Sequence, residues 1–380
     1  MRLCRSYHLL GIIVVAVVLA CFAACSHVNF TYDDVDGTPD KVDVKFSVIW
    51  PEGFASDGQL PSSVTVLMSR IVNEVHYVWD EDMDDADVPD SETSAPDAAD
   101  PEADGVVEDN AHIVLVGDYY VTACGFLPET YSIVGLDKFR SDNGFGMMNL
   151  KAVIPVVSRD DIAARFGKIK DFNPAFDFIE EASPLGLSVV KPSILPGSGT
   201  GMIDFQMKDL TMLLTLRLTV NSASGVEIGR IVADLSGVPS EIGLMNGLVT
   251  EDRTGKMCFE MEKVSSAGSE AVYEAVIRTA GLFPASSDTL RSGNGILRLT
   301  LTASSNGVTR VFYAGINLKR DIEKADLMLQ SNEKNGYRVA CSSATIEIFQ
   351  TLRVSREQIE NAGDDSLTGW FEDKDIEIEW

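Results

Sequence analysis

The sequence predicts an all-β protein, most simply two β-sandwiches, from three observations. Many short runs alternate apolar and polar residues with a period of two, which is the pattern of half-buried strands. Turn-forming residues separate these runs, and only two stretches, 160–170 and 319–328, show a helical pattern. The length of 380 residues suits two domains of ordinary size, each with its own core.

The first 26 residues indicate export and not a membrane span. Arg2 and Arg5 precede an almost unbroken apolar run, 9–24, and small residues then lead into a cysteine, which is the layout of a secretory signal. The run has about 16 residues, fewer than the roughly 20 that a spanning helix needs. We therefore expect that residues 1–24 are a signal peptide that is removed.

Small residues before a cysteine resemble the bacterial lipoprotein signal, in which the chain is cut before the cysteine and the thiol is acylated. Cys21 and Cys25 compete for this role. We favour Cys25, because Ala23 and Ala24 leave the cleavage site uncrowded and a polar segment begins at Ser26. Each buried methylene of an acyl chain such as palmitate contributes about 0.8 kcal/mol, so a multiply acylated cysteine is a stable anchor. The alternative is a plain signal peptide whose cysteines lie in the apolar run.

The charge of the chain excludes some partners. The sequence has 58 acidic and 31 basic residues, and its formal net charge is −27. Such a surface repels nucleic acid and anionic membrane faces. We expect no nucleic-acid partner, and we expect membrane contact only through the N-terminal lipid.

The strand pattern begins after an acidic tether, 25–40. Residues 42–50 alternate strictly until Pro51 stops them, and 63–78 predicts a second strand and a third. Close to Lys208 loop chemistry ends and a new strand-rich run begins, so we expect an N-terminal sandwich over 41–208 and a C-terminal sandwich over 209–380. The further expected strands are 112–124, 185–191, 203–207, 212–220, 228–235, 257–262, 271–278, 296–302, 309–316, 344–349 and 375–380.

An acidic segment, 80–110, interrupts the first sandwich. It holds fourteen acidic residues, three prolines and no Lys or Arg, so it cannot bury enough apolar surface to offset its ordering entropy. We expect a disordered insertion. Asp80, Asp82 and Asp84 have the spacing of a calcium loop, but Asp85 stands where that loop wants Gly and Ser91 where it wants Glu, which favours a solvated insertion.

Several pieces of the chain, taken in order, resemble the Bacteroidales lipoproteins related to fimbrillins and to the anchor subunit of minor fimbriae. The resemblance covers most of the chain after the signal. Its pieces are Cys25 with the acidic tether and the strand 42–50, then Gly117-Asp118-Tyr119-Tyr120-Val121, then Ala233-Asp234-Leu235-Ser236-Gly237-Val238, and finally Gly369-Trp370-Phe371-Glu372-Asp373 before the closing run 376–380.

The resemblance implies two tandem transthyretin-like β-sandwich domains, a lipid anchor, and a place in a cell-surface fimbrial or adhesin-like assembly built by strand addition. Acidic residues soon after the lipidated cysteine, here Asp33, Asp34 and Asp36, resemble the signals for the outer face of the outer membrane. Arg70 and Arg140 are lone basic residues and offer no convincing cleavage site. This departure favours an anchor, length-regulating or accessory role over that of a polymerising shaft subunit.

Two tripeptides resemble the Asp-Ser/Thr-apolar acceptor for O-glycosylation in these bacteria. They are Asp288-Thr289-Leu290 and Asp365-Ser366-Leu367, so Thr289 and Ser366 are the candidate acceptors. The alternative is that so short a pattern arises by chance in a chain rich in Asp.

No catalytic, metal or cofactor site is expected. His27, His76 and His112 belong to no His-Glu-x-x-His motif, and no Gly-x-Ser-x-Gly elbow occurs. The glycines of 196–201 do not follow the dinucleotide-binding spacing. After Cys25 three cysteines follow, Cys124, Cys258 and Cys341, whose separations match no compact metal site; we expect buried small apolar residues and not a bridge.

A second function stays open, that of a surface lipoprotein that holds a glycan for an outer-membrane importer. Sugar rings stack on flat aromatic faces, and Trp79, Trp370 and Trp380 are the candidates. The alternative for these residues is that they close the ends of the sandwiches or pack inside. An enzyme would need His and carboxylates brought together in one cleft.

Overall fold

The computed structural model describes residues 41–51, 53–54, 61, 63–71, 75–82, 112–127, 130–141, 146–167, 173–197, 200–331, 336–361 and 377–379. The expected signal peptide, Cys25, the tether and residues 83–110 of the acidic segment lie outside these ranges. The chain divides into two compact units. The smaller one holds Met1–Lys45, Asp109–Gly117 and Ser193–Gly201, and the larger one holds Phe46–Glu108, Asp118–Pro192 and Met202–Trp380.

The smaller unit contains a short antiparallel ladder. The first residues of β1 (Lys41–Ile49) pair with β4 (His112–Leu115), with Lys41 opposite Leu115. Val42, Val44 and Val114 are buried. The alternation that predicted a strand after the tether is thus the alternation of buried and exposed side chains on β1.

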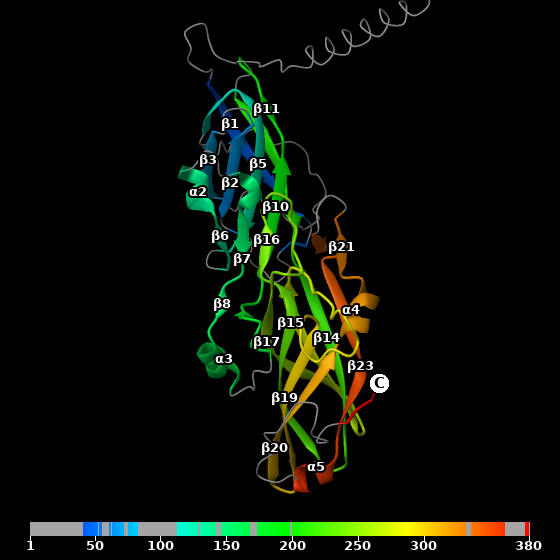
Figure 1. The fold of residues 1–380 in the computed structure, drawn as a ribbon. Helices are drawn as coiled ribbons and strands as arrows, with labels where there is room; N and C mark the ends of the chain where they lie inside the picture. The colour runs from blue at the N-terminus through cyan, green and yellow to red at the C-terminus, as the bar shows by residue number, and fades with distance from the viewer. Residues whose placement is uncertain are drawn as a thin grey trace, which may run out of the picture. The chain divides into compact units, whose positions relative to one another are not determined.

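The largest sheet of the larger unit holds ten of the described strands (Figure 1). Eight of them follow one another in the order β20-β19-β15-β17-β18-β14-β23-β24. Neighbours pair antiparallel except β14 and β23, which are parallel. The bounds are β14 (Met212–Ser222), β15 (Glu227–Pro239), β17 (Thr254–Ala267), β18 (Glu270–Thr279), β19 (Ile296–Ser305), β20 (Val308–Asn317), β23 (Ser343–Val354) and β24 (Glu377–Glu379).

Strand β17 folds this sheet into two layers. It pairs with β15 as far as Met261 and with β18 from Glu262 onward. The inward side chains of β14, such as Leu216, and those of β19, such as Leu299, belong to one buried cluster although three strands separate them in the sheet order. Two layers with alternating inward residues that share a core are the arrangement of a β-sandwich.

A second sheet of the larger unit precedes the sandwich in sequence. Its order is β13-β10-β5-β2-β3, and it is buried on both faces, because Val66 and Leu67 of β2 are both inaccessible to solvent. Leu67 belongs to the same buried cluster as the sandwich core. The bounds are β2 (Ser63–Arg70), β3 (His76–Asp82), β5 (Gly117–Phe126), β10 (Leu185–Val190) and β13 (Lys208–Asp209).

Trp50 covers two glycines of this second sheet. A Cβ atom added to Gly125 of β5 would lie 2.4 Å from Cη2 of Trp50, and one added to Gly186 of β10 would lie 2.5 Å from Cζ3. The ring of Phe54 stacks on Trp50 at 4.6 Å. The two glycines therefore create the space in which the indole packs against the sheet.

Short elements fill the remainder. The strands are β6 (Ser132–Val134), β7 (Lys151–Val153), β8 (Val156–Val157), β9 (Phe178–Ile179), β11 (Ser193–Ile194), β12 (Gly201–Gln206), β16 (Glu241–Gly243), β21 (Met328–Gln330) and β22 (Tyr337–Val339). The helices are α2 (Leu136–Ser141), η2 (Met147–Asn149), α3 (Arg159–Phe166), α4 (Lys319–Ala325) and α5 (Arg356–Asn361).

The all-β prediction is confirmed, and both expected helices exist in shortened form. Ser158 caps α3, since its hydroxyl accepts a hydrogen bond from the backbone N–H of Asp161, and the helix ends at Gly167 with φ of +85°. Met328 was expected in a helix but begins β21. The acidic segment was expected to start as a loop at residue 80, which is wrong, because β3 continues to Asp82. The boundary near Lys208 stays a prediction.

Candidate functional site

The structure describes only some of the candidate site residues that the sequence predicts. Cys25, its competitor Cys21, Ser366, Trp370 and Trp380 all lie outside the described ranges. Thr289 and Trp79 lie within them. The loop that carries Thr289 is therefore the predicted modification site for which geometry is known.

Thr289 lies on an exposed turn between β18 and β19. Its hydroxyl is 3.1 Å from the hydroxyl of Ser287, and its backbone N–H donates to the same Ser287 oxygen at 3.4 Å. The N–H of Leu290 donates to the carbonyl of Ser287 at 3.3 Å. These local bonds hold the turn, and the Thr289 side chain is exposed at its tip.

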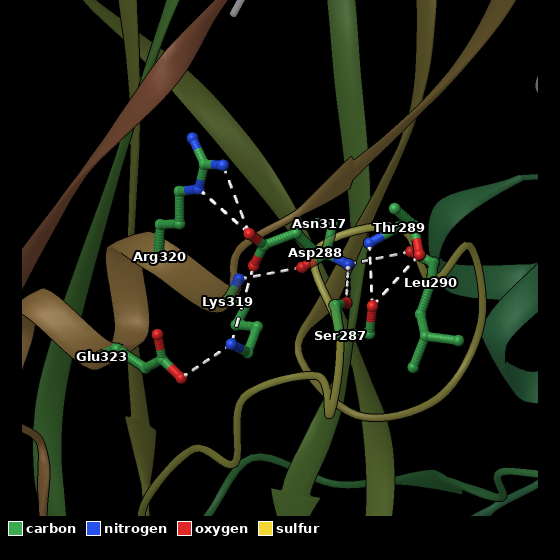
Figure 2. A network of polar contacts seen from close by, with 8 residues as sticks. All are labelled: Ser287, Asp288, Thr289, Leu290, Asn317, Lys319, Arg320 and Glu323. Carbon is green, nitrogen blue, oxygen red and sulfur yellow. Dashed lines mark hydrogen bonds and ion pairs between the residues drawn. The ribbon is translucent and has the colours of Figure 1, made fainter.

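Asp288 links this turn to helix α4 by ion pairs (Figure 2). Its carboxylate accepts hydrogen bonds from Nε and Nη2 of Arg320 at 3.3 and 3.2 Å, and it lies 3.7 Å from Nζ of Lys319. Lys319 also pairs with Glu323 one turn along the helix, at 3.1 Å. Exposed pairs of this kind contribute little stability each, but together they fix Asp288 beside the helix.

Asn317 joins the ends of the same turn. Its side-chain amide donates to the carbonyls of Ser287 and Leu290 at 3.0 and 2.9 Å, while its Oδ1 accepts from the N–H of Lys319 at the start of α4. Figure 2 shows these bonds on either side of Asp288 and Thr289. Leu290 also lines a cavity of about 410 Å³. The arrangement presents an exposed hydroxyl on a braced turn, which suits an acceptor of a covalent group.

Trp79 is half-buried on β3 and belongs to an aromatic cluster. It stacks on Tyr77 with ring centroids 5.3 Å apart and an interplanar angle of 4°, and the ring of Phe46 is 5.5 Å away. Phe46 in turn contacts Phe205 at 5.7 Å. Packing among other aromatic rings thus accounts for much of the Trp79 surface.

The cysteines agree with expectation at two positions of three. Cys124 and Cys258 are buried, and no disulfide joins the three cysteines within the described chain. Cys341 is exposed, so the expectation that it is a buried apolar residue is wrong. It lies in the short connection between β22 and β23, where its side chain meets solvent.

His76 lies half-buried on β3 with its ring 4.3 Å from that of Phe139. Within the parts of the chain that the structure describes, no three His, Cys, Asp or Glu side chains are grouped so that they could hold a metal ion. None of the described helices combines the length and the apolar character that a membrane crossing requires.

Sequence reasoning missed the charged side chains that are buried inside strands. Lys256 of β17 is 1% exposed; its Nζ donates to the carbonyl of Asn173 at 2.9 Å and lies 4.1 Å from the ring centroid of Phe178. Arg278 of β18 is 4% exposed and pairs with Asp209. Strand alternation does not predict this burial. It places Lys256 on the face opposite Met257, and Arg278 on the face opposite Ile277, and those two neighbours belong to the buried core.

No family model and no curated protein matches this chain. Among solved structures, it is similar to a candidate adhesin from Bacteroides ovatus, with 12% identity, a TM-score of 0.45, and coverage of 76% of this chain and 86% of that chain. It is also similar to a candidate polysaccharide-binding protein from Bacteroides thetaiotaomicron, with 11% identity, a TM-score of 0.38, and coverage of 83% and 92%.

The fimbrial anchor protein Mfa2 from Porphyromonas gingivalis is a further similar structure, with 14% identity, a TM-score of 0.34, and coverage of 83% of this chain and 91% of that chain. These descriptions name the kinds of protein that the sequence resemblance also names. With TM-scores below 0.5, however, they add no argument about the function of this chain.

Proposed function

We propose that this protein is a lipid-anchored protein of the cell surface that acts, without catalysis, as an anchor, accessory or adhesin subunit of a fimbria-like assembly at the outer membrane. The observation that carries the proposal is the export signal that ends in a cysteine, followed by an all-β body that begins at Lys41. A signal of this kind places a folded body outside the cytoplasm and ties it to lipid.

The tether is long enough for this role. Fifteen residues lie between Cys25 and Lys41, and the sixteen steps from one to the other reach about 55 Å at most in an extended chain. The β-sheet body can therefore stand clear of the lipid headgroups and present its sheet edges to other subunits.

The C-terminal strand supports assembly through sheet edges. β24 adds to the edge of β23 with Thr351 opposite Glu379 and Arg353 opposite Glu377. The edge of β23 thus accepts an extended segment through backbone hydrogen bonds, which is the physical basis of strand addition. At the other end of the sheet order, β20 presents an edge that carries the part-exposed residues Val308 and Val311.

Acyl labelling of variants in which one cysteine is replaced tests the anchor. Cells that express the wild type, Cys25→Ala or the matched control Cys21→Ala are grown with an alkyne analogue of palmitate and then fractionated. We expect Cys25→Ala alone to lose both the label and its retention in the outer membrane. Loss of the label in Cys21→Ala instead would move the anchor to that residue, and an unlabelled wild type would refute the lipid anchor.

Crosslinking of intact outer membranes tests the assembly. We expect fimbrial-type subunits to be captured with the wild type and lost with Cys25→Ala. Capture of an importer channel together with soluble glycan would contradict the fimbria-like role and favour the glycan-holding alternative.

We also propose that Thr289 and Ser366 are O-glycosylated. The exposed Thr289 hydroxyl and the braced turn that carries it support the first of these sites. The intact mass of the exported protein should fall by one glycan in Thr289→Val and in Ser366→Ala. It should not change beyond the side-chain difference in Thr309→Val, which alters an exposed Thr that does not follow Asp.

A further inference from the structure

The larger unit contains a cavity of about 840 Å³ that none of the predicted functions uses. Residues on both sides of Lys208 in the sequence line it: the end of β2, the middle of β5 and the end of β10 on one side, and the connection after β16 and the β21–β22 hairpin on the other. This volume falls in the range of sites for small molecules.

The charge of the cavity is opposite to that of the protein. Its described lining includes Arg70, Lys191 and Arg338 and contains no Asp or Glu. The whole chain has 58 acidic residues against 31 basic ones. Most of such a surface repels an anion, whereas a concave site whose described charged residues are all basic attracts it.

Arg70 provides the sharpest indication of a ligand. The residue is 7% exposed, its Nε has no hydrogen-bond partner among the described residues, and no described carboxylate forms an ion pair with it. The backbone of Arg70 is fixed in two ways. The residue pairs with Tyr119 of β5, and its N–H donates a 2.9 Å hydrogen bond to the carbonyl of Val75. A buried guanidinium nitrogen without a hydrogen-bond partner is unfavourable, and a carboxylate is the group that satisfies guanidinium donors two at a time.

The remaining lining residues indicate what else the ligand carries. Lys191 Nζ lies 4.6 Å from the ring centroid of Tyr120, so the cation is held on the aromatic face, and no acid of the described ranges pairs with it. Asn246 and Gln330 offer amide groups, and methionine and aliphatic side chains form the apolar wall. A sugar acid combines hydroxyl groups, an apolar ring face and one carboxylate.

We propose that this cavity binds a carboxylated saccharide, a hexuronic acid or sialic acid unit, with Arg70 as the main partner of the carboxylate and with Lys191 and Arg338 as supporting cations. The proposal goes beyond the assembly role and does not depend on it. Binding at this site requires neither the lipid anchor nor any fimbrial partner.

Titration of the detergent-solubilised full-length protein by calorimetry or saturation-transfer NMR tests the proposal. The probes are glucuronic acid and N-acetylneuraminic acid, with glucose and N-acetylglucosamine as neutral counterparts. We expect the acids to bind at least tenfold more tightly than the neutral sugars, and we expect the affinity to fall as salt concentration rises.

Variants assign the binding to the cavity. Arg70→Gln should weaken acid binding tenfold or more, and Arg338→Gln, which alters an exposed rim residue, should weaken it severalfold even if Arg70→Gln fails to fold. Arg253→Gln, an exposed arginine outside the cavity, serves as the matched control and should leave binding unchanged.

Three results would overturn the proposal. The first is equal affinity for acidic and neutral sugars, and the second is unchanged acid binding in both cavity variants. The third is binding of a capped dipeptide with a free carboxylate as tightly as the sugar acids, because it would show a general carboxylate site in place of a saccharide site.

Discussion

Arg278 and Asp209 form a charged pair inside the larger unit. Nη1 of Arg278 lies 3.5 Å from Oδ2 of Asp209 and 3.1 Å from the hydroxyl of Thr211, which itself donates to Asp209 at 2.7 Å. Burial raises the pKa of Asp209, whereas the bonds from Thr211 and the charge of Arg278 lower it. Ionising the Asp209 carboxylate is thus costly in the folded state, but its negative charge stabilises the buried guanidinium of Arg278.

Removing this carboxylate should destabilise the protein strongly. Asp209→Ala removes a carboxylate that pairs with the buried guanidinium of Arg278, and we expect a loss of about 3 to 5 kcal/mol in the free energy of unfolding, measured by urea denaturation. Asp204→Ala, at an exposed position of β12, should change stability by less than about 0.5 kcal/mol. Similar losses in the two variants would show that the buried pair has no special role.

Burial also separates the cysteines by reactivity. The pKa of the Cys258 thiol is raised to about 12, mainly because the residue is buried and secondly because the charge of Asp234 is near. Since the thiolate is the nucleophile, Cys258 should be inert near pH 8, whereas the exposed Cys341 should react.

Brief alkylation of the native protein with iodoacetamide, followed by peptide mass spectrometry, checks this prediction. We expect label on the Cys341 peptide and none on the peptides of Cys124 and Cys258 until the protein is unfolded in urea. Rapid native labelling of Cys258 would mean that β17 opens easily.

At the scale of elements, a bulge in β15 fixes the loop that follows β18. The register of β15 against β17 shifts between Ser236 and Val238, and Gly237 between them has φ of +89°. A Cβ atom at Gly237 would lie 2.7 Å from both the backbone N of Gly295 and the carbonyl oxygen of Phe283. The glycine therefore permits two segments of backbone to touch, and it lies within the 233–238 stretch that contributes to the family resemblance.

Gly237→Ala should cost more than about 2 kcal/mol in the free energy of unfolding, because the methyl group meets backbone that cannot rotate away, in addition to the strain of positive φ. Gly268→Ala is the matched control: φ there is +63°, but the space around it is open, so a cost of about 1 kcal/mol is expected from strain alone. Equal costs in thermal or urea unfolding would show that the close approach does not matter.

Sequence reasoning was strongest where elements are long. The runs that became β14 and β19 alternate over many residues and were placed correctly, whereas β8 and β9, with two residues each, are too short for any period to show. β17 was expected over 257–262 but continues to Ala267, because its exposed second part is set by pairing with β18 and not by burial. Neither end of that strand has a local apolar signal.

The same limit applies to the candidate sites. The tripeptide that contains Thr289 is local and was found, but its ion pair joins Asp288 to Arg320, which lies 32 residues further along the chain. The basic cavity brings together Arg70 and Arg338 from opposite halves of the sequence. Each is a lone basic residue in its own stretch of sequence, and only the folded structure shows that both line the same cavity.

At the scale of the whole molecule, the larger unit has a buried cluster that runs through both halves of the sequence. It includes Leu67 on β2, Leu214 on β14 and Ile359 on α5. A core that is shared in this way couples the stability of the strands on either side of Lys208. Folding units that share a continuous core are expected to lose their structure together.

We therefore expect calorimetry of the purified protein to show one main unfolding transition whose calorimetric and van't Hoff enthalpies agree. Leu67→Ala and Leu299→Ala remove side chains that are 0% exposed, one in each predicted domain, and each should lower the midpoint of that same transition through a loss of about 2 to 5 kcal/mol. If Leu67→Ala instead splits off an early transition that Leu299→Ala leaves in place, the two predicted sandwiches are independent domains and the shared cluster does not couple them.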